Sequence, residues 1–238
     1  MSNDSFEFKQ FKIRQDKCAM KLSTDAVLLG AWVVPNGSTS ILDVGTGTGI
    51  LALMLAQKSL AEITAIDIDR NSTEQARLNV AESAFSSRIR VLHTSFQNLA
   101  QSNTGKFDLI VSNPPFFVDS LKSNDDSRKL ARHNDQLSFD DLLNGVKQLL
   151  SGKGKFCLIL PKNEALQFRD RAKLKGLYLS KLMRIRTRAD KDTEKRHLMQ
   201  FEFKETEFSE STLIIEADNQ RNYTEEYKAL TREYYLGF

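Results

Sequence analysis

The chain has 238 residues, 40% of them apolar, which is enough for a continuous hydrophobic core without disulfides or bound metal. No apolar run approaches the roughly 20 residues of a membrane-spanning helix, and the N-terminus lacks the basic flank and apolar stretch of a signal peptide. The 34 basic and 31 acidic residues leave a net charge of +3, too small to establish nucleic-acid binding but compatible with a local basic surface.

Both cysteines, Cys18 and Cys157, lie in apolar surroundings and far apart in the sequence, as expected of buried thiols in a reducing compartment. No group of His and Cys residues has the spacing of metal ligands, so no metal is implied. No internal repeat, long linker or low-complexity tract divides the chain. We therefore expect a soluble, cytoplasmic, monomeric protein with a single domain over residues 1–238.

The N-terminal segment, residues 6–34, predicts a short hairpin or extended stretch and then a helix from about Thr24 to Val33. We expect this segment to cover the ligand-binding edge of a core that spans 40–238. The tail predicts another helix, capped by Asn222 or Thr224 and running to Leu236.

From residue 40 onward, short β-branched runs alternate with amphipathic stretches, a pattern typical of βαβ units and a mostly parallel sheet. Strands are expected near 40–44, 62–67, 89–93, 107–112, 154–160, 177–186 and 197–203. Helices are expected near 48–57, 71–83, 138–150 and 163–174. Asn71 and Ser138 are the predicted N-caps of two of them. The pattern predicts an α/β fold with seven strands and helices on both faces of the sheet.

Two basic clusters interrupt an otherwise mixed surface, one of them within the polar segment 117–137. They comprise Lys122, Arg128, Lys129 and Arg132, and Lys181, Arg184, Arg186, Arg188, Lys191, Lys195 and Arg196. Segment 117–137 is either a mobile substrate-gripping loop or a surface insertion. Each cluster is either a solvated surface or, if it borders the functional site, a phosphate contact.

A glycine-rich turn, residues 43–49, follows the first core strand and precedes a helix. Such a turn brings backbone N–H groups and a positive helix end towards a ligand, although a merely tight turn has the same pattern. The next strand ends in Asp67, twenty residues after Gly47, where a carboxylate can accept both hydroxyls of a ribose. The turn lacks the Lys-Ser/Thr pair of a P-loop, which disfavours a nucleoside triphosphate but leaves a dinucleotide open.

The tetrapeptide Asn113-Pro114-Pro115-Phe116 ends a later apolar strand and indicates methyl transfer to an amine. An exocyclic base amine is a poor nucleophile because its lone pair is delocalised into the ring. The Asn113 side-chain oxygen and the Pro114 carbonyl are two acceptors that localise this pair, while Phe116 offers an aromatic face for a base. Pro114 and Pro115 restrict the backbone, so the acceptors need little ordering. A rigid turn that merely ends the strand is the structural alternative.

The two motifs together favour S-adenosyl-L-methionine as the cofactor. This donor carries an electrophilic methyl group on a sulfonium and no phosphate, which suits a turn with an acid at Asp43 in place of a lysine. We expect Asp43 to orient the turn and to reach the methionine amino group directly or through water. Hydride transfer to or from a dinucleotide would not need the acceptor pair at Asn113.

The chain resembles class I S-adenosylmethionine-dependent methyltransferases of Rossmann-like fold, and more closely the bacterial tRNA(Val) adenine-N6 methyltransferases that modify position 37 beside the anticodon. The resemblance covers nearly the whole chain and is carried by residues 8–11, 16–21, 24–25, 28–32, 51–57, 108–116, 222–227 and 229–231. The terminal segments are the most specific, because many amine methylases share the central motifs.

The resemblance assigns roles to individual residues. It implies cofactor contacts for Gly45, Gly47, Gly49 and Asp67, and presentation of the adenine by residues 113–116. Lys21, Thr24 and Asp25 would lie over the methionine end of the cofactor or the target base. Apart from the resemblance, Arg128, Arg132 and His133 are candidate tRNA contacts because they lie in the polar segment that follows Asn113.

The chain departs from the family at two places. Phe116 stands where tyrosine is common, which keeps stacking and removes a hydroxyl. An acid commonly follows the third strand to meet the cofactor adenine, whereas here the sequence is His93-Thr94-Ser95-Phe96, so Ser95 or backbone groups would substitute.

Other activities share the tetrapeptide: N5-methylation of glutamine in release factors, N6-methylation of DNA adenine and N2-methylation of rRNA guanine. The chain has neither a separate N-terminal helical domain, as expected for the first, nor a target-recognition domain, as expected for the second. A non-catalytic RNA-binding module with an inactive cofactor pocket is a further alternative.

Overall fold

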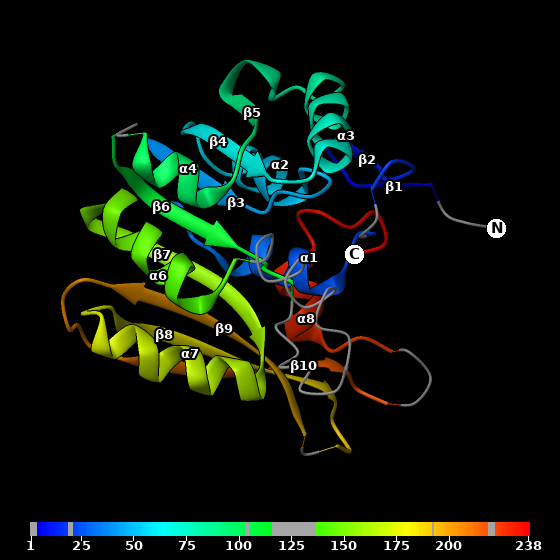
Figure 1. Cartoon of the computed structure of the whole chain (residues 1–238). Helices are drawn as coiled ribbons and strands as arrows, with labels where there is room; N and C mark the ends of the chain where they lie inside the picture. The colour runs from blue at the N-terminus through cyan, green and yellow to red at the C-terminus, as the bar shows by residue number, and fades with distance from the viewer. Residues whose placement is uncertain (1–3, 19–20, 103–104, 116–136, 192, 219–221) are drawn as a thin grey trace, which may run out of the picture.

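The computed structural model describes residues 4–18, 21–102, 105–115, 137–191, 193–218 and 222–238. It begins with a two-stranded hairpin, β1 (Ser5–Glu7) and β2 (Lys12–Arg14), followed by helix α1 (Thr24–Trp32), as the N-terminal sequence predicts. The other described residues form one twisted sheet with helices on both faces (Figure 1).

Five strands of this sheet run parallel. They are β3 (Ser40–Val44), β4 (Glu62–Asp67), β5 (Ile89–His93), β6 (Phe107–Ser112) and β7 (Leu150–Pro161). The order β7-β6-β3-β4-β5 places β3 at the centre, with β4 and β6 beside it. The carboxyl ends of β3, β4 and β6 therefore meet at one edge, where a ligand binds in open sheets of this kind.

The remaining three strands extend the sheet beyond β7 in the order β9, β8, β10. Strand β9 (Glu194–Glu202) is antiparallel to β7 and to β8 (Tyr178–Arg188), and β10 (Ser209–Glu216) is parallel to β8. The sheet thus has eight strands, and the predicted number of seven is wrong. Strand β10 is an edge strand whose first four residues are exposed, so its sequence carries little apolar signal.

Alternate residues of each central strand enter two separate hydrophobic cores. Ile41 and Leu109 pack into the core beneath α1, whereas Leu42 and Ile110 pack into the core on the opposite face. The helices of the first core are α1, α2 (Ile50–Gln57), α3 (Arg70–Ala81) and α8 (Glu225–Thr231), and those of the second are α4 (Phe96–Gln101), α6 (Phe139–Leu149) and α7 (Lys162–Leu174). Burial on both faces explains why these strands read as continuous apolar runs.

Helix ends agree with the sequence in part. Ser138 caps α6 in a capping box with Asp141, as predicted. The N-cap of α3 is Asp69, not Asn71, because the Asp69 side chain accepts from the Ser72 N–H. Helix α8 is capped by Thr224 but ends at Thr231, short of the predicted end. Helix α4 was not expected from the sequence, since six residues carry too little periodicity.

The N-terminal hairpin is fastened beside the glycine turn by a buried asparagine. The Asn79 side chain of α3 pairs with the backbone N–H and C=O of Arg14, at 2.9 Å each, and donates to the Thr48 carbonyl at 2.8 Å. The Lys17 N–H donates to the side chain of Gln75, also on α3. Lys21, Leu22 and Ser23, directly before α1, line the cavity at the carboxyl edge of the sheet.

Both cysteines are buried and free. In the part of the chain that the structure describes, no helix has both the length and the apolar character needed to cross a bilayer.

Candidate active site

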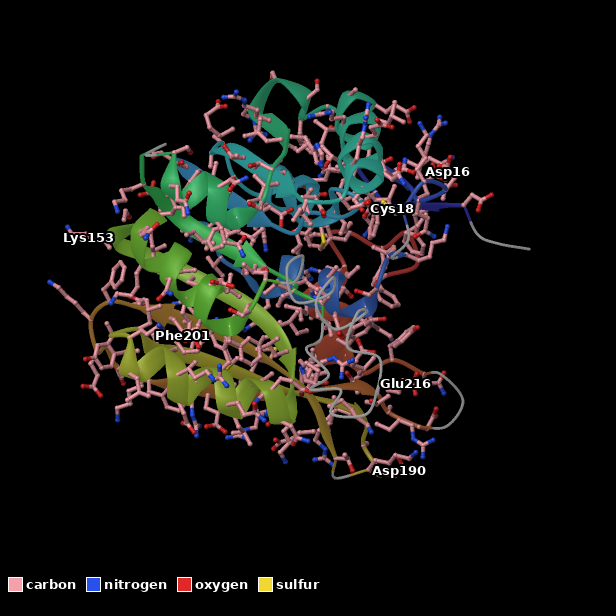
Figure 2. All side chains as sticks on the ribbon, viewed as in Figure 1. Asp16, Cys18, Lys153, Asp190, Phe201 and Glu216 are labelled. Atoms are coloured by element: carbon pink, nitrogen blue, oxygen red, sulfur yellow. The ribbon has the colours of Figure 1, made fainter. Side chains whose placement is uncertain are left out.

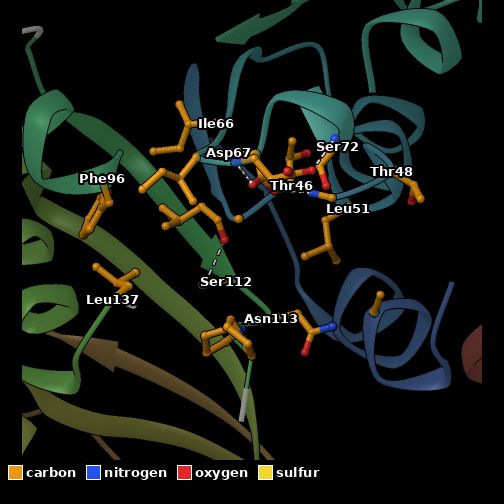
Figure 3. A pocket seen from close by; sticks show the side chains of 18 of the residues that line it. Thr46, Thr48, Leu51, Ile66, Asp67, Ser72, Phe96, Ser112, Asn113 and Leu137 are labelled. Carbon is orange, nitrogen blue, oxygen red and sulfur yellow. Dashed lines mark hydrogen bonds between the residues drawn. The ribbon is translucent and has the colours of Figure 1, made fainter. Parts of the chain in front are cut away.

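A cavity of about 850 Å³ opens at the carboxyl ends of β3, β4 and β6, a size typical of ligand pockets (Figure 3). The glycine turn lines it from β3, Asp67 from β4, and Asn113 and Pro114 from the end of β6. The structure thus brings together two motifs that lie about sixty residues apart in the sequence.

The glycine turn is held by its neighbouring strand. The Gly45 and Thr46 N–H groups both donate to the Ile66 carbonyl at 2.9 Å, and the Gly47 N–H donates to Asp67 Oδ2 at 2.8 Å. These three donors therefore do not face the ligand, contrary to the sequence-based expectation. Because these amides are already hydrogen-bonded within the protein, the turn is unsuited to binding a phosphate.

The backbone of the turn requires glycine. Gly45 and Gly47 have φ angles of +74° and +54°, in the left-handed region that other residues rarely adopt. No atom lies within 4 Å of a Cβ built at either position, so conformation and not crowding excludes larger residues. The absence of side chains at Gly45 and Gly47 leaves room for a ligand in the cavity next to the turn.

Asp67 is half-buried and accepts two backbone hydrogen bonds, from Gly47 to Oδ2 and from Asp69 to Oδ1, the latter at 2.9 Å. Burial raises the pKa of its carboxyl group, while the two amides lower it. Each oxygen retains a further lone pair. Asp67 is thus oriented by the chain and still able to accept from hydroxyl groups in the cavity.

Asp43 is fully buried behind the turn and accepts the Thr46 hydroxyl at 2.6 Å. Burial raises the pKa of this carboxyl to about 7, against the opposing effect of the Thr46 hydrogen bond. The predicted role in orienting the turn agrees with this bond. Contact with a ligand stays a prediction, because Asp43 is not among the described residues that line the cavity.

Ser95 lines the far end of the cavity and is the N-cap of α4, where its side chain accepts from the Asn98 N–H at 3.1 Å. Its hydroxyl proton remains available for donation. Gln97 and Asn98 also line the cavity, and nothing in the sequence indicated them as site residues. Both residues belong to helix α4, which the sequence did not predict.

Asn113 is half-buried, directly after the last residue of β6. The Ser112 hydroxyl donates to the Val44 carbonyl at 2.9 Å and ties the ends of β6 and β3 together. The Asn113 Nδ2 amide group lies 3.5 Å from Ser23 Oγ, the N-cap of α1. Ser23 was not predicted as a site residue; its place before a helix marked a cap, but nothing in the sequence indicated the contact with Asn113.

Several predicted substrate residues differ in their placement. Lys21 lines the cavity and donates to the Gln15 carbonyl at 2.6 Å. Asp25 is not among the described lining residues; its carboxylate accepts from Arg196 Nε at 2.7 Å, which ties α1 to β9. Phe116, Arg128, Arg132 and His133 lie outside the described residues.

An open, mainly parallel sheet with a glycine turn after β3, an acid ending β4 and Asn-Pro-Pro after β6 defines a class I methyltransferase. A family model described as methyltransferase small domain matches residues 21–163. A tRNA1(Val) (adenine(37)-N6)-methyltransferase of Bacteroides fragilis is 46% identical, with 99% of each chain covered. The corresponding protein of Trichodesmium erythraeum is 44% identical over 100% of each. The chain belongs to this methyltransferase family, which confirms the resemblance.

Solved structures agree with the fold. A ribosomal protein L11 methylase of Lactobacillus delbrueckii superposes with a TM-score of 0.56 at 20% identity, covering 80% of this chain and 83% of that one. A 16S rRNA N2 G1207 methyltransferase of T. thermophilus, solved with AdoMet and guanosine, superposes with a TM-score of 0.58 at 21% identity. The match covers 84% of this chain and 50% of that one.

Proposed function

We propose that this enzyme transfers a methyl group from S-adenosyl-L-methionine to N6 of adenosine 37 in tRNA1(Val), beside the anticodon. One observation carries the proposal: Asn113 and Pro114 line the same cavity as Asp67 and the glycine turn. The relatives named for this activity, at 41–46% identity over essentially the full chain, support the choice of substrate.

The cavity suits the donor. The amides of Gly45, Thr46 and Gly47 are already bonded within the protein, so the turn favours a ligand without a phosphate. We assign Asp67 to the ribose hydroxyls, the turn at Gly45, Gly47 and Gly49 to the methionine part with Asp43 behind it, and Ser95 to the adenine end. When bound, S-adenosyl-L-methionine supplies an electrophilic methyl group on a positively charged sulfur.

The chain's own residues then act on the substrate amine. Asn113 Oδ1 and the Pro114 carbonyl accept the two N6 protons of the adenine, which localises the nitrogen lone pair and directs it into the cavity. Pro115 holds this geometry, and Phe116, by the motif alone, offers a stacking face. No general base is required, because the methylated nitrogen is acidic enough to lose its extra proton to water. Catalysis is therefore mainly positioning and electrostatics.

We further propose that the enzyme is a monomer of a single methyltransferase domain and acts in the cytoplasm. Support for one domain comes from the central sheet, which is shared by the two hydrophobic cores, one on each of its faces. Size-exclusion chromatography with light scattering tests the monomer, for which the expected mass is 27.0 kDa.

The test of the activity is methylation of an unmodified tRNA1(Val) transcript, followed by nucleoside mass spectrometry. N6-methyladenosine is expected in the wild-type transcript and absent when adenosine 37 is replaced by guanosine. Unchanged tRNA, together with methylglutamine in a release factor offered to the same enzyme, would replace this assignment with protein methylation. Loss of the modification from tRNA1(Val) in a deletion strain would extend the result to the cell.

A further inference from the structure

The positive charge of the chain is concentrated in one hairpin. Residues 181–196 hold seven basic and three acidic residues, a net charge of +4, whereas the whole chain carries only +3. The other 222 residues are therefore slightly acidic in sum. We call residues 181–196 the basic hairpin; those that the structure describes form most of β8, part of the connection that follows it and the start of β9.

The basic hairpin lies at the same edge of the sheet as the cavity. Strand β8 runs parallel to β7, so its basic end points in the direction in which β6 leads to Asn113. Figure 2 places Asp190, in the turn, at the far side of the sheet from Lys153 at the amino edge. The Ala189 N–H donates to the Glu216 carbonyl at 3.1 Å, which joins the turn to the end of β10.

The start of β9 is connected to the active site through α1. Arg196 binds Asp25, and two residues before Asp25, Ser23 meets Asn113. Arg196 on β9 pairs with Pro161 on β7, and Ser112 on β6 pairs with Leu158, three residues before Pro161. Strand β9 is two strands from β6. With about 3.3 Å per residue and about 4.8 Å per strand, the hairpin starts roughly 15 Å from Asn113 and its turn lies roughly 30 Å away.

Arginines in the hairpin mainly stabilise its shape. Arg184 pairs with Glu194 at 3.2 Å and with Glu210 at 2.5 Å, and Arg188 pairs with Asp190. Arg186 donates to the Lys191 and Ala189 carbonyls across the turn. Ion pairs and backbone hydrogen bonds thus hold the described part of the hairpin together.

Lys191 and Lys195 differ from these arginines in having no ion pair with a described residue. Both side chains are exposed, and among the residues that the structure describes no carboxylate lies within ion-pairing distance of either. No large exposed hydrophobic residue lies among the described residues of the hairpin. The core of a protein interface is mostly apolar, and stable binding to a membrane surface combines basic charge with an apolar anchor. A phosphate backbone needs only positive charge on a rigid support.

We propose that the basic hairpin, through Lys191 and Lys195, binds phosphates of the tRNA whose base occupies the cavity. This inference rests on the proposed function. The hairpin sets the position of the nucleic acid without reading its sequence, while the cavity selects the base. Its distance from Asn113 places the contact on nucleotides that flank the target base.

The experiment compares Lys191→Ala/Lys195→Ala with Lys153→Ala/Lys204→Ala, a matched pair of exposed lysines at the amino edge of the sheet. Dissociation constants for unmodified tRNA1(Val) are measured by fluorescence anisotropy over a series of salt concentrations. The hairpin variant should bind about tenfold more weakly, and the slope of log K against log salt should fall by about two, one for each lost phosphate contact. Binding of S-adenosyl-L-methionine and the thermal midpoint should match wild type in both variants.

The outcomes separate the two hypotheses. If wild-type enzyme methylates tRNA but the hairpin variant shows the affinity and salt slope of the control, the hairpin assignment is overturned and the proposed function stands. If the wild type neither binds nor methylates tRNA, the proposed function fails, whichever lysine is changed. Loss of binding to anionic vesicles in the hairpin variant, with unchanged tRNA binding, would assign the hairpin to a lipid surface and overturn the proposal.

Discussion

Asn113 Nδ2 lies 3.5 Å from Ser23 Oγ, which also accepts the Ala26 N–H at 3.2 Å as the N-cap of α1. The hydroxyl oxygen has two lone pairs, and these two donors occupy both. With its amino group towards Ser23, the Asn113 amide turns its oxygen away from α1. One serine thus begins a helix and orients the side chain proposed to accept from the substrate.

Replacing Ser23 by alanine should lower kcat more than it changes cofactor affinity. The lost hydrogen bond is long, so we expect an effect of about 0.5–1.5 kcal/mol, or a kcat lower by roughly two- to tenfold. Steady-state kinetics with saturating tRNA measures it. The lost cap should also destabilise the fold by about 1 kcal/mol.

Ser138→Ala is the matched control, because Ser138 caps α6 through the same kind of bond and is not among the described residues that line the cavity. The Ser138→Ala change should destabilise the fold by about as much as Ser23→Ala and leave kcat unchanged. Equal loss of kcat in both variants would show that Ser23 acts through stability alone.

Asn113→Ala removes the side-chain acceptor and leaves the cofactor half of the cavity intact. Methyl transfer should fall by about a hundred- to a thousandfold, as when a preorganised hydrogen-bonding group is lost from an active site. Calorimetry should give a dissociation constant for S-adenosyl-L-methionine within about twofold of wild type. Full activity in this variant would sink the mechanism.

Asp67→Ala removes an acceptor that the turn holds in place through the Gly47 N–H. Charge-assisted hydrogen bonds contribute about 1.5–3 kcal/mol, so the cofactor should bind roughly 10- to 100-fold more weakly. The cofactor affinity of Asp67→Asn should lie between those of the wild type and Asp67→Ala, since the amide keeps one acceptor oxygen.

A suitable comparison for Asp67 is Asp108→Ala. Asp108 also accepts backbone N–H groups, from Thr39 and Ser40, but is not among the described lining residues. This change should affect stability and not cofactor affinity. Weakened cofactor binding in both variants would argue against a direct contact by Asp67.

Asp43 should make the stability of the free enzyme depend on pH. Its folded pKa of about 7 lies above the ordinary value of 3.8, so between these values the folded chain binds more protons than the unfolded chain. The free energy of unfolding therefore falls as pH rises through this window and levels off above pH 7. Between pH 5.5 and pH 8 the contribution of Asp43 to the free energy of unfolding should fall by about 2 kcal/mol.

Asp43→Asn isolates this contribution, because the amide oxygen can still accept from Thr46 but does not titrate. Urea unfolding of both proteins at the two pH values gives the difference, in which all other titrating groups cancel. A difference that is the same at pH 5.5 and pH 8 would contradict the raised pKa.

The strand pattern and the two central motifs were accessible from the sequence because they depend on short-range physics. A strand buried on both faces is apolar at nearly every position, as in the run before Asn113, and a turn with positive φ requires the glycines at 45 and 47. The errors fall where tertiary packing replaces local preference. Strand β10 pairs at an exposed edge, and Asp69 rather than Asn71 caps α3 because β4 ends two residues earlier.

Residue types and spacing by themselves predicted the class of reaction: a proposed amine acceptor at Asn113, an acid at Asp67 and a turn without a phosphate-binding lysine. Contacts between distant segments were not readable, because each joins residues whose separation in sequence carries no signal. Ser23 meets Asn113 across ninety positions, and Asp25 holds Arg196 across 171. Chain folding alone determines at which edge of the sheet the basic hairpin lies and which of its arginines are already neutralised, since ion pairs form in space and not along the sequence.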